Sequence, residues 1–381
     1  MVSQKVVCPI MWAATFNPSP YREGQQLDLQ VCESYSGDLP SRVTATISKV
    51  LSMTMSVVLD VGVQTRHEDS LTGFVTHGPP IHHVLKLYDR RFGSSLRDIL
   101  EDKPAPYTRE NEEAFQTFVQ RGMMPEFLRY LKKRNETEQF AVAAWQFLDE
   151  PNRTEGLAKY EATLWHDCIE HFECEITAYN RLGDLQGTLV PHILANISLS
   201  SIQLVTMPRE AAPYFDVKGI LLERIDRYCL GDLTLSPLPN NLRIWQQIIQ
   251  SAVDAAHEIN KRGIIMKDCA PRNVVVDGQS NTPRIVDLAQ CRFRDKLAKR
   301  WYKNGWNEDD GWDPDVEYWE QVGTASNPAA IGAVMVMRIQ NITGVKLDVE
   351  YPDYEAIIAG TRRRKAEAAV AEKQKGAAKS S

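Results

Sequence analysis

The sequence lacks a long apolar run, a strong net charge and a cysteine pattern typical of disulfides. No window of its 381 residues is apolar over the roughly 20 positions that a membrane-spanning helix needs. Its 44 basic and 50 acidic residues give a formal charge of -6, which does not favour a nucleic-acid partner. The seven cysteines are odd in number and irregularly spaced, which predicts reduced thiols. We therefore expect an intracellular protein, cytoplasmic or nuclear, with no membrane or nucleic-acid partner. The oligomeric state is unknown from the sequence.

Changes of pattern along the chain predict four regions. Residues 1–35 are predicted to be an N-terminal extension, 36–225 a first lobe, 226–355 a second lobe, and 356–381 a basic, disordered tail. Within the first lobe, apolar residues at spacings of three and four predict a helical insertion at about 90–170.

Strand patterns surround that insertion. The segments "SRVTATISKV", "MSVVLDVGV" and "HHVLKLYDRRF" are rich in β-branched residues and predict three antiparallel strands. The segments "TLVPHILANISL" and "VKGILLERI" return to the strand pattern after the insertion. The segment "NNLRIWQQIIQSAVDAAHEINKRG" carries a continuous apolar stripe and predicts a helix that ends at Gly263.

The segment after Gly263 carries the most informative residues. In "IIMKDCAPRNVVVDGQSNTPRIVDLAQ", Asp268 and Asn273 precede a short strand, and Asp287 follows a second strand after a turn. A hairpin would bring its two ends together and so place Asn273 near Asp287. Carboxylate and amide oxygens suit Mg²⁺, which takes its other ligands from water and phosphates. A magnesium site is therefore predicted at Asn273 and Asp287, with Asp268 close by.

These motifs resemble those of the protein kinase superfamily, and the surrounding sequence resembles the divergent kinase-like proteins abundant in fungi. The first motif, Met266–Asn273, resembles the family's HRD-x-x-x-x-N loop, and Asp287–Ala289 resembles DFG. The resemblance covers roughly residues 45–345. It implies an α+β, two-lobed fold with a small antiparallel-sheet N-lobe, a helical insertion and a short, mainly helical C-lobe.

The resemblance also assigns roles to residues. Asp268 would be catalytic and orient the acceptor hydroxyl, while Asn273 and Asp287 would hold Mg²⁺ and, through it, ATP. Lys86 would neutralise the ATP phosphates, and the helical residue Glu175 would hold Lys86 in place. These two complete the catalytic set.

The segment "GILLERI" resembles the family's hinge. It implies nucleotide contacts by Glu223 and Ile225.

Several features depart from the family pattern. Met266 replaces the His of HRD, and Ala289 replaces the Gly of DFG. No glycine-rich loop precedes Lys86, whose only candidate phosphate cover is "KVLSMTMSVV". About 90 residues separate Lys86 from Glu175, and no APE motif follows Asp287.

Three functions remain open. The first is an ATP- and Mg²⁺-dependent phosphotransferase acting on protein Ser/Thr hydroxyls, or on a small molecule as in the related aminoglycoside phosphotransferases. The second is a pseudokinase that serves as a nucleotide- or partner-binding scaffold. The third is a helical scaffold in which the Asp268 and Asn273 spacing is incidental.

One cluster of cysteine and histidine and one further cysteine are candidates for additional sites. The segment "HDCIEHFEC" (166–174) spreads its His and Cys side chains too widely around one helix for a closed zinc site. Cys269, beside Asp268, is either a reactive thiol or a packing residue, and packing is favoured.

Overall fold

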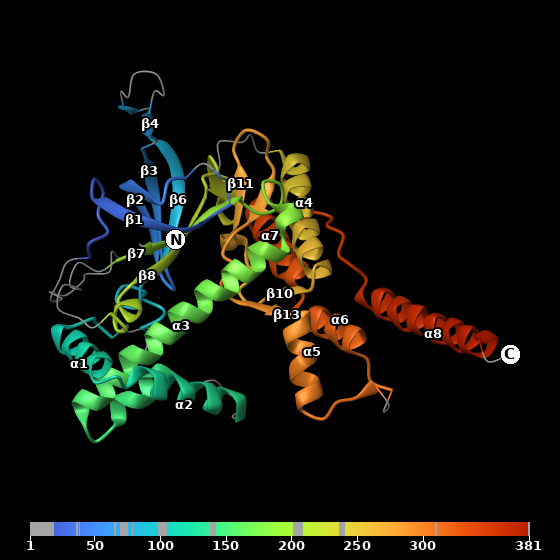
Figure 1. Cartoon of the computed structure of the whole chain (residues 1–381). Coiled ribbons are helices and arrows are strands. Elements are labelled where there is room, and N and C mark those ends of the chain that lie inside the picture. The colour runs from blue at the N-terminus through green and yellow to red at the C-terminus, as the bar shows by residue number, and fades with distance from the viewer. Residues whose placement is uncertain are drawn as a thin grey trace. The chain divides into compact units, whose positions relative to one another are not determined.

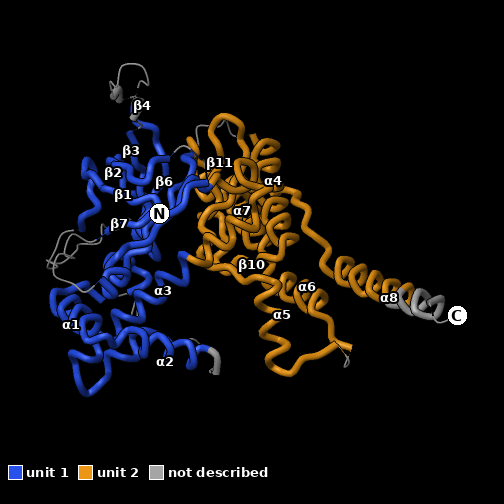
Figure 2. The backbone as a smooth tube through the Cα atoms, in the orientation of Figure 1, with its two compact units in different colours: residues 1–172, 193–224 blue, residues 173–192, 225–381 orange. Residues whose placement is uncertain are grey.

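The computed structural model describes residues 19–35, 37, 39–64, 66–68, 75–77, 79–97, 105–137, 142–200, 209–235, 241–308 and 311–379. The chain divides into two compact units, one of residues 1–172 and 193–224, the other of residues 173–192 and 225–381 (Figure 2). The predicted boundary at 225 had instead placed 173–192 with the first region. None of the described helices combines the length and the apolar character that a bilayer crossing requires.

A closed antiparallel barrel forms the centre of the first unit (Figure 1). Its strand order is β1-β2-β3-β6-β8-β7. The antiparallel sheet is confirmed, but its closure was not predicted. The bounds are β1 Gln26–Ser34, β2 Arg42–Met53, β3 Val57–Val63, β6 Ile81–Tyr88, β7 Ile193–Leu199 and β8 Val217–Glu223, and a separate pair is formed by β4 Arg66–Glu68 and β5 Val75–His77.

Strand β1 corrects the prediction that residues 1–35 are only an extension. Its sequence alternates, with Leu27 and Leu29 buried between exposed polar neighbours. It pairs with β2 on one side and with β7 on the other, and this second pairing closes the barrel. The inward apolar side chains of all six strands form one core, so β1 belongs to the fold of this unit.

The helices of the first unit lie largely where the insertion was predicted, at about 90–170, except for a short 3-10 helix at 212–214. They are α1 Arg109–Gln120, α2 Met124–Thr137, the short 3-10 helices η1 Ala144–Asp149 and η4 Ala212–Tyr214, and α3 Arg153–Arg181, whose residues up to 172 belong to this unit. Thr108 begins α1 with a capping box, in which its hydroxyl accepts the Asn111 N–H. Phe115, Phe118 and Phe127 contribute to a second core packed among these helices.

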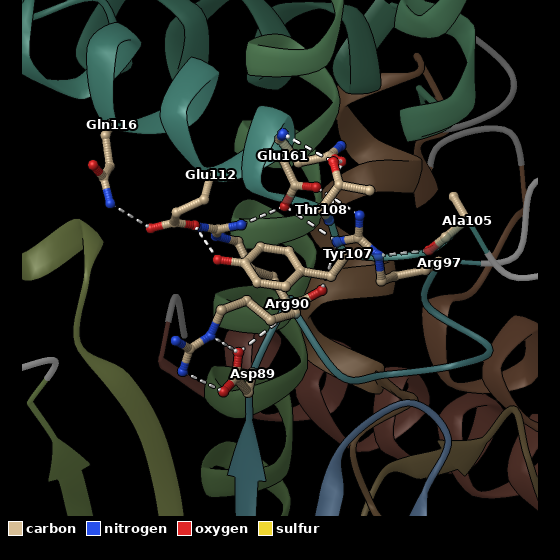
Figure 3. Close-up of polar contacts among 11 residues, drawn as sticks. Asp89, Arg90, Arg97, Ala105, Tyr107, Thr108, Glu112, Gln116 and Glu161 are labelled. Atoms are coloured by element: carbon tan, nitrogen blue, oxygen red, sulfur yellow. Dashed lines mark hydrogen bonds and ion pairs between the residues drawn. The ribbon is translucent and has the colours of Figure 1, made fainter. Parts of the chain in front are cut away.

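A buried ion network, made of Arg90, Arg97, Glu112 and Glu161, connects the end of β6 with α1 and α3 (Figure 3). Glu161 is fully buried and accepts hydrogen bonds from Arg90 and, at 2.6 Å, from Arg97. Arg90 also donates to Glu112. Buried charges of this kind are tolerated only when they are paired and hydrogen-bonded. The network therefore explains how a charged segment can follow directly after a buried strand.

The second unit is mainly helical, with short strands between the helices (Figure 1). The predicted helix is confirmed as α4, and Gly263 follows it with φ +77°, a left-handed conformation that suits glycine. The bounds are η2 Gly183–Leu185, β9 Arg227–Cys229, η5 Leu230–Leu235, α4 Leu242–Lys261, β10 Ile264–Met266, η6 Pro271–Asn273, β11 Val274–Asp277, β12 Pro283–Ile285, β13 Cys291–Phe293, α5 Arg294–Lys303, α6 Pro314–Ala325, α7 Asn327–Thr343 and α8 Tyr354–Lys379.

Helix α8 corrects the prediction of a disordered tail from residue 356. The segment is rich in Ala, Glu, Lys and Arg, which are strong helix formers even without an apolar stripe. Asp353 accepts the Ala356 N–H at 2.9 Å just before the helix. Arg362 and Lys365 also form ion pairs with α6 and with the residue before it, at Glu320 and Asp313. Local propensity and these contacts together give the tail a helical structure.

Candidate functional site

The loop that carries Asp268 is positioned by α4 and β10. Asn241 caps α4 by accepting the N–H groups of Arg243 and Ile244. Gly263 turns the chain into β10, which pairs with β13. Asp268 follows two residues after β10 ends and is partly exposed, so its carboxylate lies at the surface of a well-packed element.

Buried asparagines brace this loop at Met266. Asn327 accepts the Met266 N–H at 3.1 Å and donates to the Met266 carbonyl at 2.7 Å. Asn260 donates to the same Asn327 oxygen at 2.9 Å. The backbone on both sides of Met266 is therefore held through α4 and α7. This support could not be predicted from the motif, because Asn327 lies 61 residues from Met266 in the chain.

The side chain of Asn273 is hydrogen-bonded to both the backbone and the side chain of Asp268. Its Nδ2 donates to the Asp268 carbonyl at 2.8 Å and to the Asp268 carboxylate at 3.1 Å. Since these bonds use the nitrogen of the amide, Oδ1 is the side-chain atom left to accept a ligand. Arg272 also forms an ion pair with Asp268.

The predicted hairpin brings Asp287 to the same place. Strands β11 and β12 pair in the register Val274↔Ile285, and the Val286 N–H donates to the Asn273 carbonyl at 2.9 Å. Asp268, Asn273 and Asp287 consequently line one small pocket. We call these three residues the Asp268 cluster.

Asp287 has an uncommon backbone conformation. Its φ is +65°, in the left-handed region, which most residues with a side chain avoid and which Asn and Asp tolerate best. Non-glycine residues in this region are concentrated at functional sites. The conformation is therefore a second indication, besides the pocket, that residue 287 has a specific role.

Glu175 contacts the segment that follows Asp287. It is fully buried on α3, and its Oε1 accepts the Leu288 N–H at 3.1 Å. This contact was not predicted, since the resemblance assigned Glu175 only to Lys86. The pairing of Glu175 with Lys86 stays a prediction, because the two residues belong to different units.

The remaining predicted nucleotide residues lie on neighbouring strands or just after them. Lys86 is 4 % exposed on β6, opposite Val58 of β3 and Ile220 of β8. Its ammonium lies 5.5 Å from the centre of the Tyr88 ring. Glu223 ends β8. Ile225, two residues later, is buried and belongs to the second unit.

The donor set of the Asp268 cluster fits a hard cation. It offers carboxylate oxygens and one amide oxygen, which suit Mg²⁺, an ion that usually takes its remaining ligands from water and phosphates. The fixed orientation of the Asn273 amide supports this fit, because the bonds to Asp268 keep Nδ2 on the Asp268 side.

Cys269 behaves as a packing residue. Burial, with the nearby Asp268 carboxylate, raises the pKa of its thiol to about 12. Its sulfur also lies 3.4 Å from the Asn327 carbonyl oxygen. A thiol so difficult to ionise is a poor nucleophile, so the packing alternative is favoured over the reactive one.

Comparisons with known proteins give limited information. No protein-family model matches the chain, and no curated protein matches it. Among solved structures, the chain is similar to WaaP in complex with acyl carrier protein, at 18% identity and a TM-score of 0.24, over 34% of this chain and 52% of that one. It is also similar to mutants of the PknI kinase domain of Mycobacterium tuberculosis. One double mutant has 13% identity and a TM-score of 0.27, over 64% of this chain and 60% of that one.

The chain thus spans 52% of the length of the WaaP chain and 60% of that of the PknI double mutant. At such TM-scores the matches decide neither fold nor function. The assignment of function depends on the residues of this chain.

Proposed function

We propose that this chain is an ATP- and Mg²⁺-dependent phosphotransferase of the protein kinase-like class, acting on protein Ser/Thr hydroxyls. The observation that carries the proposal is the Asp268 cluster, in which a carboxylate, an amide and a second carboxylate line one pocket. Asp and Asn are common in ordinary turns. The combination of a bonded Asp268 and Asn273 with a left-handed Asp287 across a hairpin is much more specific.

Phosphoryl transfer suits such a site, because its loose transition state needs mainly positioning and charge stabilisation. Asn273 and Asp287 would hold Mg²⁺, which would neutralise charge on the phosphates. Asp268 would orient the acceptor hydroxyl and accept its proton late in the reaction. Lys86 would contact the phosphates from its strand, and Glu175 would help to position the residues after Asp287 through its bond to Leu288.

A cavity beside the loop supports access of an acceptor. It has a volume of about 310 Å³ and includes Lys267 and Cys269, the two neighbours of Asp268 in the chain. Arg292 lines it as well. An acceptor with a negative charge near its hydroxyl would be complementary to the basic side chains of Lys267 and Arg292.

A pseudokinase scaffold is the second candidate, and the turn between β2 and β3 favours it. Thr54–Ser56 form this turn and include no glycine that would let backbone amides approach phosphates. The Met53 and Thr54 carbonyls accept the N–H groups of Ser94 and Ser95 at 3.1 and 3.2 Å. The turn is therefore tied to the segment after β6, in a manner that differs from a flexible phosphate cover.

A thermal-shift titration tests the proposal. The full chain is heated with ATP, with and without Mg²⁺, as wild type, as Asp287→Asn and as Asp348→Asn, an exposed aspartate used as the matched control. Because a ligand that binds the folded state raises its apparent stability, the melting temperature should rise with Mg²⁺-ATP in the wild type and control. The rise should be lost in Asp287→Asn.

The outcomes test the nucleotide site that the phosphotransferase requires. A Mg²⁺-dependent rise that Asp287→Asn removes supports the nucleotide site, and a substrate screen follows. A rise that is the same in all three proteins would remove Asp287 from the site. No rise at millimolar ATP would contradict the phosphotransferase and leave the partner-binding scaffold.

A further inference from the structure

Two cysteines meet beside the segment that carries Asp287. Cys174 lies on α3, directly before Glu175, and Cys291 begins β13. The Cys174 sulfur accepts the Cys291 N–H at 3.2 Å and lies 3.5 Å from the Cys291 carbonyl oxygen. The two thiols are also near enough to influence each other's ionisation. The two residues are far apart in the chain, so their contact is a product of the fold.

The two sulfurs differ in the way that an attacking and a resolving thiol differ. A hydrogen bond from the Cys291 thiol and one from its backbone N–H stabilise the Cys174 thiolate against the effect of burial, and its pKa falls to about 7. The same thiol contact and burial raise the pKa of Cys291. The other charged groups around the pair are Lys296, Glu175 and Asp287.

Two other thiols, those of Cys168 and Cys269, lack these properties. Cys168 is 2 % exposed, and burial raises its pKa well above the usual value. Cys269 is shifted in the same direction. Both would react slowly with an oxidant, since the thiolate is the reactive form. Cys174 is therefore distinguished by its neighbour Cys291 as well as by its ionisation.

We propose that Cys174 and Cys291 form a peroxide-oxidisable dithiol that closes to a disulfide. In the first step the Cys174 thiolate attacks one oxygen of hydrogen peroxide, so that an S–O bond forms, the O–O bond breaks, and hydroxide leaves and is protonated to water. The Cys291 thiol then attacks the sulfenic sulfur of Cys174. The S–S bond forms, the S–O bond breaks, and the departing hydroxide leaves as water with the Cys291 proton. Two thiols are oxidised by two electrons, and one peroxide is reduced to two waters.

The disulfide would join α3 to β13 next to the hydrogen bond between Glu175 and Leu288. Cys174 precedes Glu175, and Cys291 lies shortly after Leu288, whose N–H Glu175 accepts. Because a disulfide restrains the unfolded chain, the oxidised protein should melt at a higher temperature. This inference does not depend on phosphotransferase activity.

Mass spectrometry of the full chain tests the dithiol directly. Wild-type protein is treated with a small excess of hydrogen peroxide, remaining thiols are alkylated, and non-reduced peptides are analysed. The expected product is a crosslinked pair of peptides that contain Cys174 and Cys291, with the loss of two hydrogens, and dithiothreitol should reverse it. The melting temperature should rise with the crosslink and fall again on reduction.

Single substitutions identify the roles of the two sulfurs. In Cys291→Ser, Cys174 should stop at the sulfenic acid, which dimedone traps, and oxidation should not raise the melting temperature. Cys174→Ser should form no crosslink, whereas the control Cys229→Ser should form it as the wild type does. If wild-type peroxide treatment oxidises the exposed Cys32 while Cys174 and Cys291 stay alkylatable, the proposal is overturned. A Cys174 crosslink to any other cysteine would overturn it too.

Discussion

The buried ion network and the Asp268 cluster use similar residues for different purposes. In the network, Glu161 is fully buried between two arginines, and each of its oxygens accepts a guanidinium hydrogen bond. In the cluster, Asp268 is partly exposed and Asp287 is exposed, and both face a pocket. Carboxylates matched by buried cations mainly hold a fold together, whereas accessible carboxylates grouped around a fixed amide are suited to bind a ligand.

The largest expected effect is the loss of stability in Glu161→Gln. The substitution leaves Arg90 and Arg97 buried without their shared counter-charge, which typically costs about 3–5 kcal/mol of unfolding free energy. Urea unfolding of the full chain measures it. Glu110→Gln is the control, because the Glu110 pair with Arg153 is exposed and its loss should leave the unfolding curve unchanged. If the unfolding curve of Glu161→Gln were also unchanged, the buried ion network would not stabilise the fold, and burial would not distinguish it from the Asp268 cluster.

Asp268→Asn should reduce phosphate transfer and leave the stability of the fold unchanged, in contrast to Glu161→Gln. It keeps the size of the side chain, so the melting temperature should stay close to that of the wild type. If Asp268 accepts the acceptor proton, phosphate transfer to a protein substrate should fall by about 10³-fold, while the Mg²⁺-ATP thermal shift remains. Turnover is measured by phosphate incorporation. A variant that unfolds early but transfers phosphate normally would place Asp268 with the structural carboxylates.

Acid should affect the network through Glu112. Burial alone would raise its pKa, but Arg90 and the hydrogen bonds from Tyr107 and Gln116 outweigh this and lower it from 4.5 to about 2. A carboxylate with a lowered pKa stabilises the fold above its unfolded-state value, and this contribution is lost as pH falls from about 4.5 toward 2. The contribution is on the order of 3 kcal/mol.

Urea unfolding at a series of acidic pH values checks this expectation. Glu112→Gln is the comparison, because it cannot gain a proton in this range and should show a flatter decline of unfolding free energy. Parallel declines in the two proteins would assign the acid sensitivity to other carboxylates.

Local patterns were sufficient to predict the elements that hold the Asp268 cluster. The stripe of α4, the stop at Gly263 and the hairpin of β11 with β12 all depend on neighbours in the chain, and the structure confirms them. The cluster itself was predicted from spacing, and its three residues do line one pocket. The roles of Lys86, Glu223 and Ile225 stay predictions.

Features that depend on distant pairing could not be read in this way. Strand β1 was missed because its partner β7 lies far along the chain, and only that pairing closes the barrel. The network was missed for the same reason, since Arg90 and Glu161 come from separate segments. The charged residues directly after the buried strand β6 were the available signal, because buried charges require partners.

The left-handed backbone of Asp287 restricts which residues this position can accept. Glycine adopts such a conformation freely, Asn and Asp tolerate it, and branched side chains are strained there. Of the three suitable residues, only aspartate carries a charge. The backbone conformation therefore favours these three residue types, and the proposed metal site would favour aspartate among them. Asp287→Gly would keep the left-handed backbone conformation and remove the carboxylate charge. The effects of conformation and of charge at this position could then be measured separately.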